Sequence, residues 1–165
     1  VMVAKGGAHL LQDSAVEAII EYLLPRADII TPNLPEAAAI LGQSEAQDFE
    51  RMQFQAKALH KMGVKNVLLK GGHLSTDKAS DCLIEANGQM SWFESKRIDT
   101  RHTHGTGCTL SAAICALYPR EQDLKQTISK AKDYLYHAIE AGKNLGIGQG
   151  IGPLHHFFHY WQDES

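Results

Sequence analysis

Apolar side chains recur at helical or strand spacing along the first half of the chain, and this pattern predicts a regular order of elements. Residues 13–25 have helical spacing; Ser14 and Glu17 are placed to form a capping box, and Pro25 to end the helix. The following residues are predicted to form a strand at 27–33, helices at 34–42 and 49–62, and a strand at 64–70. Strands that alternate with helices indicate βαβ units, in which helices cover a parallel sheet.

The pattern changes after the strand at 64–70. The dipeptide Asn87-Gly88 separates two short runs and is a strong hairpin signal, so we expect a hairpin near 81–93. Residues 1–4 are apolar and typical of the end of a buried strand, so we expect the chain to begin inside a fold. The predicted architecture is α/β, with a mostly parallel sheet, this hairpin, and an N-terminal part of the fold missing.

The second half of the chain is predicted to be mainly helical. Helical spacing covers 106–117, and Asp123 with Gln126 is placed to cap a long helix. The apolar stripe of that helix consists of Leu124, Ile128, Ala131, Leu135, Ala138 and Ile139. A glycine-rich loop follows, and a last short helix is predicted over 154–161.

Composition excludes several classes of protein. The 165 residues are 44% hydrophobic and 21% charged, with a formal net charge of -3, which is typical of one globular domain. Lysine and arginine form no basic stripe, and no apolar run approaches the ~20 residues of a membrane span, so we expect neither nucleic acid nor membrane as a partner. Three cysteines without framework spacing favour a reducing cytoplasm.

Nine histidines are a high number for this length. Five of them lie in two clusters, formed by His102, His104, His155, His156 and His159. No zinc-binding spacing accompanies them, so we expect solvated histidines in loops and on helix surfaces.

The segment Gly105-Thr106-Gly107-Cys108 opens a predicted helix. Glycines let the backbone approach a ligand, and a helix N-terminus offers unpaired N–H groups and a positive dipole end, so the segment is a candidate anion site. A cysteine at this position is also a candidate base. The alternative is a glycine-rich loop that only begins a helix.

Three more polar side chains follow predicted strands. Lys70 ends one strand, and Asn33 and Glu36 follow another. Ligands of parallel sheets bind beyond the carboxyl ends of the strands, where a lysine suits phosphate and a carboxylate suits Mg²⁺. Alternatively, Glu36 is an acid favoured by the helix dipole and Lys70 a solvated strand end. Cation, acid and anion site together are the parts that phosphoryl transfer needs.

The segments "TPNLPEA", "VLLKGGH" and "HGTGCTLSAAI" resemble the hydroxymethylpyrimidine and hydroxymethylpyrimidine-phosphate kinases of thiamine biosynthesis, within the ribokinase-like superfamily. "VMVAK" is similar to a family strand that begins two residues earlier, and "GIGPLHHF" to the family's G-x-G-P-L-N-H-F, with His155 in place of Asn. The resemblance implies a three-layer α/β/α sandwich. It identifies residues 1–165 as the C-terminal part of a single kinase domain.

The resemblance also implies ATP and Mg²⁺ as cofactors and 4-amino-5-hydroxymethyl-2-methylpyrimidine, then its monophosphate, as acceptors. Cys108 corresponds to the catalytic aspartate of the superfamily's sugar kinases, with the N–H groups of Gly105, Thr106 and Gly107 as the anion hole. Lys70 corresponds to a phosphate-neutralising lysine, and Asn33 and Glu36 to the family's Mg²⁺ and phosphate segment. The long helix after Asp123 would flank the adenine, and the full-length protein would form a homodimer.

The family is longer than this chain, and the part that is missing should hold most contacts to the pyrimidine. We therefore expect the isolated 165 residues to be inactive as a kinase. Two alternatives remain open at the level of sequence. One is a pyridoxal kinase of the same superfamily, and the other is a non-catalytic fragment that binds nucleotide.

Overall fold

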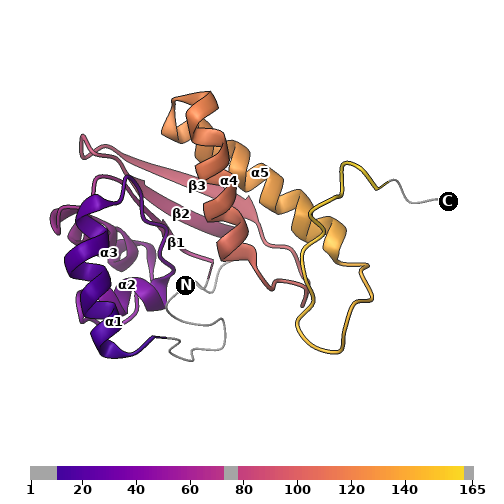
Figure 1. Ribbon diagram of the computed structural model, residues 1–165, viewed down its shortest axis with the longest axis horizontal. Helices are drawn as coiled ribbons and strands as arrows, with labels where there is room; N and C mark the ends of the chain where they lie inside the picture. The colour runs from indigo at the N-terminus through magenta and orange to yellow at the C-terminus, as the bar shows by residue number, and fades with distance from the viewer. Residues whose placement is uncertain (1–10, 73–77, 162–165) are drawn as a thin grey trace. The chain divides into compact units, whose positions relative to one another are not determined.

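The computed structural model describes residues 11–72 and 78–161 (Figure 1). The chain divides into two compact units, Val1–Lys96 and Arg97–Ser165. The strand expected at residues 1–4 lies outside the described residues.

Helix α1, Asp13–Ala18, begins the described part of the first unit and continues as a π-helical turn, Ile19–Leu23, and a 3₁₀ turn, Leu24–Arg26. The capping box expected from Ser14 and Glu17 is wrong. The helix begins earlier, with Gln12 as an N-cap that makes no side-chain hydrogen bond, so Ser14 lies inside the first turn. The acidic Asp13 in that turn complements the helix dipole instead.

Helices α2, Leu34–Leu41, and α3, Phe49–Lys61, agree with the predicted spacing. Gly42 ends α2 in the left-handed conformation, at a φ of 61°, as the sequence predicts. Helix α3 begins at Asp48, whose carboxylate accepts a hydrogen bond from the Arg51 N–H at 2.7 Å. Both helices are therefore bounded by local signals.

In the described residues of the first unit, the sheet has three antiparallel strands in the order β1-β2-β3, namely Val67–Lys70, Lys78–Ile84 and Met90–Lys96. The Asn87-Gly88 hairpin is confirmed and extends beyond 81–93 on both sides. Gly88 has a φ of 79° and donates to the Glu85 carbonyl at 2.7 Å, which matches a turn closed by a left-handed glycine.

Parallel pairing in the described residues is limited to isolated bridges. Ile30 pairs with Val67, and Asn33 with Lys70, so the segment expected as a strand at 27–33 runs parallel to β1. In the described part of the first unit, the predicted parallel pairing therefore occurs along one edge of β1. The other edge of β1 pairs antiparallel with β2 of the hairpin.

The core of the first unit lies between α2, α3 and one face of this sheet (Figure 1). Its members are buried apolar side chains of all these elements, including Leu34, Met52, Leu59, Val67, Leu69, Cys82 and Ile84. The strands alternate, so Lys70 and Asp81 lie on the opposite face from Leu69 and Cys82.

The second unit is built on two helices that pack side by side, α4, Thr106–Glu121, and α5, Leu124–Gly142 (Figure 1). Asp123 caps α5 as predicted, accepting from the Gln126 N–H at 2.8 Å. In the predicted apolar stripe of α5, the side chains of Ile128, Ala131 and Ala138 are buried. The 3.6-residue period thus identified the face of α5 that packs inward.

The last helix expected at 154–161 is wrong. Residues 156–160 form hydrogen-bonded turns, in which Phe157 accepts from the N–H groups of Tyr160 and Trp161 at 2.8 and 3.0 Å. A segment this short gains little from helix formation by itself. Ring contacts decide its path instead, since Phe158 packs against Tyr134 and His137 of α5.

Candidate functional site

Asn33 and Glu36 form a reciprocal capping box at the start of α2. The Asn33 side chain accepts from the Glu36 N–H at 2.8 Å, and the Glu36 carboxylate accepts from the Asn33 N–H at 2.9 Å. Glu36 is only 6% exposed. Glu36 is therefore an acid in the first turn of α2, which was one of its two interpretations from the sequence. The capping box fixes both side chains at the end of the 27–33 segment.

Lys70 lies beside this box. It forms a parallel bridge with Asn33, and its N–H donates to the Pro32 carbonyl at 2.9 Å. The residue is half-buried, so it is not a fully solvated strand end. The structure thus brings together the three predicted site residues of the first unit, because parallel pairing aligns the carboxyl ends of their segments.

Sequence reasoning did not single out Asp81, which lies opposite Lys70 on β2. Asp81 is 6% exposed, and its Oδ1 accepts from the Gly71 N–H at 3.0 Å. Its signal in the sequence is an acid directly before the apolar run of residues 82–84. Only the register of the hairpin shows that this acid lies opposite Lys70.

The Gly105–Cys108 segment belongs to the second unit. Gly105 is the N-cap of α4 with a φ of 86°, and no side chain caps this helix start among the described residues. Thr106, Gly107 and Cys108 form the first turn, and the Cys108 side chain is exposed. The N-cap therefore supplies no capping side chain, as an anion site requires, and the Thr106 N–H makes a long hydrogen bond of 3.4 Å to the Thr103 carbonyl.

The segment before this helix is held by the C-terminal loop. His104 forms a parallel bridge with Pro153, and its N–H donates to the Gly152 carbonyl at 3.1 Å. His102 is only 8% exposed, and its Nδ1 has no hydrogen-bond partner among the described residues. The expectation of a solvated histidine is wrong for His102, because Gly152 packs directly against its ring.

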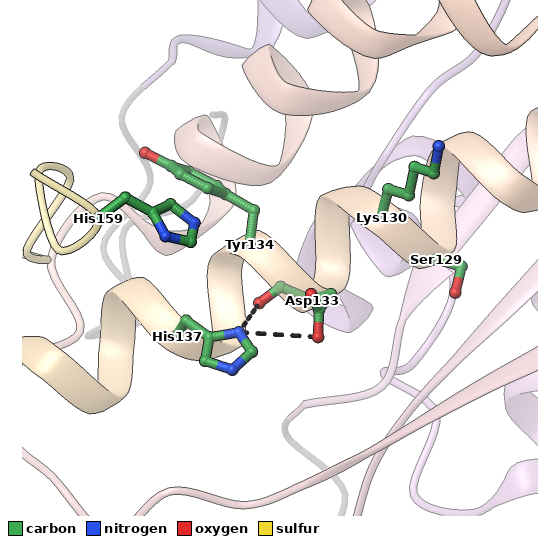
Figure 2. Close-up of a pocket in the computed structure, with 6 residues that line it drawn as sticks. All are labelled: Ser129, Lys130, Asp133, Tyr134, His137 and His159. Atoms are coloured by element: carbon green, nitrogen blue, oxygen red, sulfur yellow. Dashed lines mark hydrogen bonds and ion pairs between the residues drawn. The ribbon is translucent and has the colours of Figure 1, made fainter.

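A surface hollow of about 380 Å³ lies along α5, the helix that resemblance places beside adenine. Figure 2 shows its lining residues, which are Ser129, Lys130, Asp133, Tyr134, His137 and His159. His137 contacts Asp133 through both the backbone carbonyl and the carboxylate, at 2.9 and 3.6 Å. The side chains of His137 and Asp133 are exposed, and the lining of the hollow includes none of the predicted site residues.

Within residues 11–72 and 78–161, no group of three or more His, Cys, Asp or Glu side chains is arranged to hold a metal ion. No helix within these ranges has the length and apolarity to cross a membrane. One carboxylate and one amide, Glu36 and Asn33, still suit Mg²⁺, which keeps several waters and binds through one or two protein oxygens plus substrate phosphates.

A family model described as phosphomethylpyrimidine kinase matches residues 1–155. The chain belongs to this family. The match includes both groups of predicted site residues, those around Lys70 and those around Cys108. The resemblance drawn from the sequence motifs is thereby confirmed.

Curated relatives agree with the family. The hydroxymethylpyrimidine/phosphomethylpyrimidine kinase of Salmonella typhimurium is 46% identical over 98% of this chain and 60% of its own length. The protein of the same description from Bacillus subtilis is 40% identical over 95% of this chain and 57% of its own length. The chain therefore spans about 60% of the length of these relatives.

Solved structures establish the fold. An ADP complex of Bacillus subtilis pyridoxal kinase matches with a TM-score of 0.85 and 36% identity, over 96% of this chain and 59% of that one. A phosphomethylpyrimidine kinase from Clostridium difficile matches with a TM-score of 0.70 and 35% identity, over 84% and 55%. The chain has the ribokinase-like α/β fold of these kinases, and the partial coverage of their chains fits the predicted missing part.

Proposed function

We propose that the protein, in its full natural length, transfers the γ-phosphoryl group of ATP to the hydroxymethyl group of 4-amino-5-hydroxymethyl-2-methylpyrimidine. A second transfer adds a phosphate to the monophosphate, giving the diphosphate used in thiamine biosynthesis. The observation that carries the proposal is 46% identity, over 98% of this chain, to a relative described as a kinase of both compounds.

The start of α4 is assigned to the transferring phosphoryl group. The N–H groups of Gly105, Thr106 and Gly107 meet the negative charge that spreads over the phosphoryl oxygens, and the helix dipole adds to this effect. A glycine at each side of Thr106 lets the backbone approach the ligand closely. Cys108, exposed in the same turn, is assigned to receive the proton of the acceptor hydroxyl.

Lys70, Asn33 and Glu36 are assigned to the phosphates and Mg²⁺ of the bound nucleotide. When bound, ATP supplies the phosphoryl group and Mg²⁺ supplies charge neutralisation. Lys70 adds a positive charge to the phosphates. Asn33 and Glu36, fixed by their capping box, present oxygen atoms that bind Mg²⁺ directly or through water.

The proposal also covers the cellular location, the oligomeric state and the ligands of the protein, and the activity of the isolated chain. The full-length protein would be a cytoplasmic homodimer with small-molecule ligands, as the family resemblance implies, and would bind no nucleic acid. The isolated 165 residues would be inactive, because they span about 60% of the length of active relatives. Pyrimidine-dependent ATP consumption by the purified 165-residue chain would contradict this.

A second candidate is phosphorylation of pyridoxal. It is favoured by the ADP complex described as a pyridoxal kinase, whose TM-score of 0.85 exceeds the 0.70 of the phosphomethylpyrimidine kinase structure. The acceptor is again a hydroxymethyl group on a nitrogen heterocycle, so the same residues would serve both reactions.

Parallel assays on the full-length protein test the proposal. We expect ATP consumption with the hydroxymethylpyrimidine and with its monophosphate, and a kcat/KM for pyridoxal at least tenfold lower, a difference of about 1.4 kcal/mol in transition-state binding. A higher kcat/KM for pyridoxal would select the second candidate. No transfer to any of the three acceptors would overturn both.

A further inference from the structure

Lys70 and Asp81 occupy directly opposed positions on the antiparallel strands β1 and β2. Opposed residues of a sheet extend their side chains to the same face, with β-carbons about 5 Å apart. A lysine and an aspartate in this relation form a pair of opposite charge at the end of β1. This is the end at which Lys70 also meets Asn33.

The Asp81 carboxylate is tied to the backbone that follows Lys70. Its Oδ1 accepts from the buried Gly71 N–H at 3.0 Å. Gly71 itself has no room for a side chain, because an added β-carbon would overlap the Ser80 carbonyl oxygen and lie 2.9 Å from the sulfur of Met52. The chain at Gly71 is thus pressed onto β2, and Asp81 holds it there.

The burial of Asp81 determines how its negative charge interacts with neighbouring groups. A carboxylate that is 6% exposed loses most of its hydration, so it favours a nearby cation and fixed N–H donors. A lysine side chain is long and flexible, and holding its ammonium in one place costs conformational entropy. A fixed negative charge opposite Lys70 reduces that cost at the moment of reaction.

We propose that Asp81 is a positioning residue for Lys70 in the phosphoryl transfer described above, a role that rests on the proposed function. One carboxylate oxygen fixes the Gly71 amide and hence the end of β1. The negative charge restrains the Lys70 ammonium near the strand end. Asp81 acts through Lys70 and needs no contact with the nucleotide or the acceptor.

A purely structural role for Asp81 makes different predictions. If the carboxylate served only to hold the hairpin, its removal would lower stability and would act independently of Lys70. If it positions Lys70, removing its charge has no effect once the Lys70 side chain is gone. The two roles therefore differ in additivity, which a double-mutant cycle measures.

The experiment uses the full-length protein and four forms: wild type, Asp81→Asn, Lys70→Ala and the double variant. Asp81→Asn keeps an oxygen for the Gly71 N–H and removes the charge. We expect it to lower kcat at least tenfold, to change the KM for ATP less than about threefold, and to leave the melting temperature nearly unchanged. In the Lys70→Ala background the same change should lower kcat less than about twofold.

Ser80→Ala is the matched control. Ser80 adjoins Asp81, is also buried and extends to the other face of the sheet. Its Oγ has no partner among the described residues. It should keep the wild-type kcat. If Asp81→Asn does not fold, Asp81→Ser, which is smaller and also uncharged, replaces it in the cycle.

Losses that multiply in the double variant, or a wild-type kcat in Asp81→Asn, would overturn the positioning role while leaving the proposed function intact. A wild-type protein that transfers no phosphoryl group to any acceptor would overturn the proposed function, and this inference with it.

Discussion

Gly152 packs so closely against His102 that a β-carbon added to the glycine would overlap Nδ1 of the imidazole. His102 is buried and lies three residues before Gly105, and the neighbouring His104 N–H donates to the Gly152 carbonyl. The C-terminal loop and the segment that leads into α4 therefore fit together only because residue 152 is glycine.

Gly152→Ala should destabilise the protein by about 1–3 kcal/mol, because the overlap forces the imidazole or the loop to move. Chemical denaturation of the variant measures this. Gly150→Ala is the matched control, since an added β-carbon there meets nothing within 4 Å. Equal unfolding free energies for the two variants would show that His102 and the loop adjust to the added β-carbon without loss of stability.

The ends of α2 and α4 offer a reciprocal test of the left-handed conformation. Gly42 ends α2 at a φ of 61°, whereas Gln122 ends α4 at a φ of 54°. Gly42→Ala should cost about 1 kcal/mol, and Gln122→Gly should gain about 0.5–1 kcal/mol, because a β-carbon is strained in this conformation. Both residues are exposed, so thermal unfolding reports the backbone effect, and changes of the same sign in the two variants would contradict it.

The buried thiol of Cys82 should make stability depend on alkaline pH. Burial raises the pKa of Cys82 to about 11 from an ordinary value of 9.0; Lys57 opposes this rise and Asp81 adds to it. The unfolded chain therefore releases the thiol proton first as pH rises. The stabilisation is complete below about pH 9 and is lost progressively as pH rises toward the folded pKa.

Unfolding free energies from neutral pH to about pH 10.5 check this, with Cys82→Ala as the control that lacks the titrating group. The wild type should lose more stability over this range than the variant. If the unfolding free energies of the two proteins fell equally with rising pH, ionisation of Cys82 would not be the cause.

Lys70→Ala in the full-length protein should lower kcat about 10²-fold, a loss of about 3 kcal/mol of transition-state stabilisation, because a positive charge at the phosphates is removed. Steady-state kinetics and thermal unfolding separate this from misfolding. Lys65→Ala is the control, since the Lys65 side chain is exposed and pairs with the exposed Asp28 at 2.8 Å. Equal kcat values for the two variants would show that Lys70 does not stabilise the transition state.

Cys108→Ser should lose most kinase activity, whereas Cys108→Asp, which restores the sugar-kinase residue, should retain more. A loose phosphoryl-transfer transition state needs little early proton removal, so a carboxylate can partly replace the base. Iodoacetamide should inactivate the enzyme, and ATP should protect it. Cys115→Ser, at an exposed position on the same helix, is the control.

Near-complete kcat in Cys108→Ser, together with alkylation that ATP does not slow, would assign catalysis to the backbone N–H groups alone.

Local signals determined the elements that the sequence predicted well. Gly42 and Asp123 mark helix ends through interactions with residues three or four positions away, which any reading of the sequence contains. The stripe on α5 and the Asn87-Gly88 turn are local in the same sense. The local reading failed at Ser14, because a competing helix start lay just before it.

Tertiary structure decided the relationships between distant positions. The opposition of Lys70 and Asp81 depends on hairpin register, where a shift of one residue would put Asp81 on the other face of the sheet. The contact of His102 with Gly152 requires the C-terminal loop to return to the start of α4. The sequence determined which residue types were available for the site and which local turns present them. Only the chain's long-range pairing, driven by burial of its apolar faces, determined which of them became neighbours.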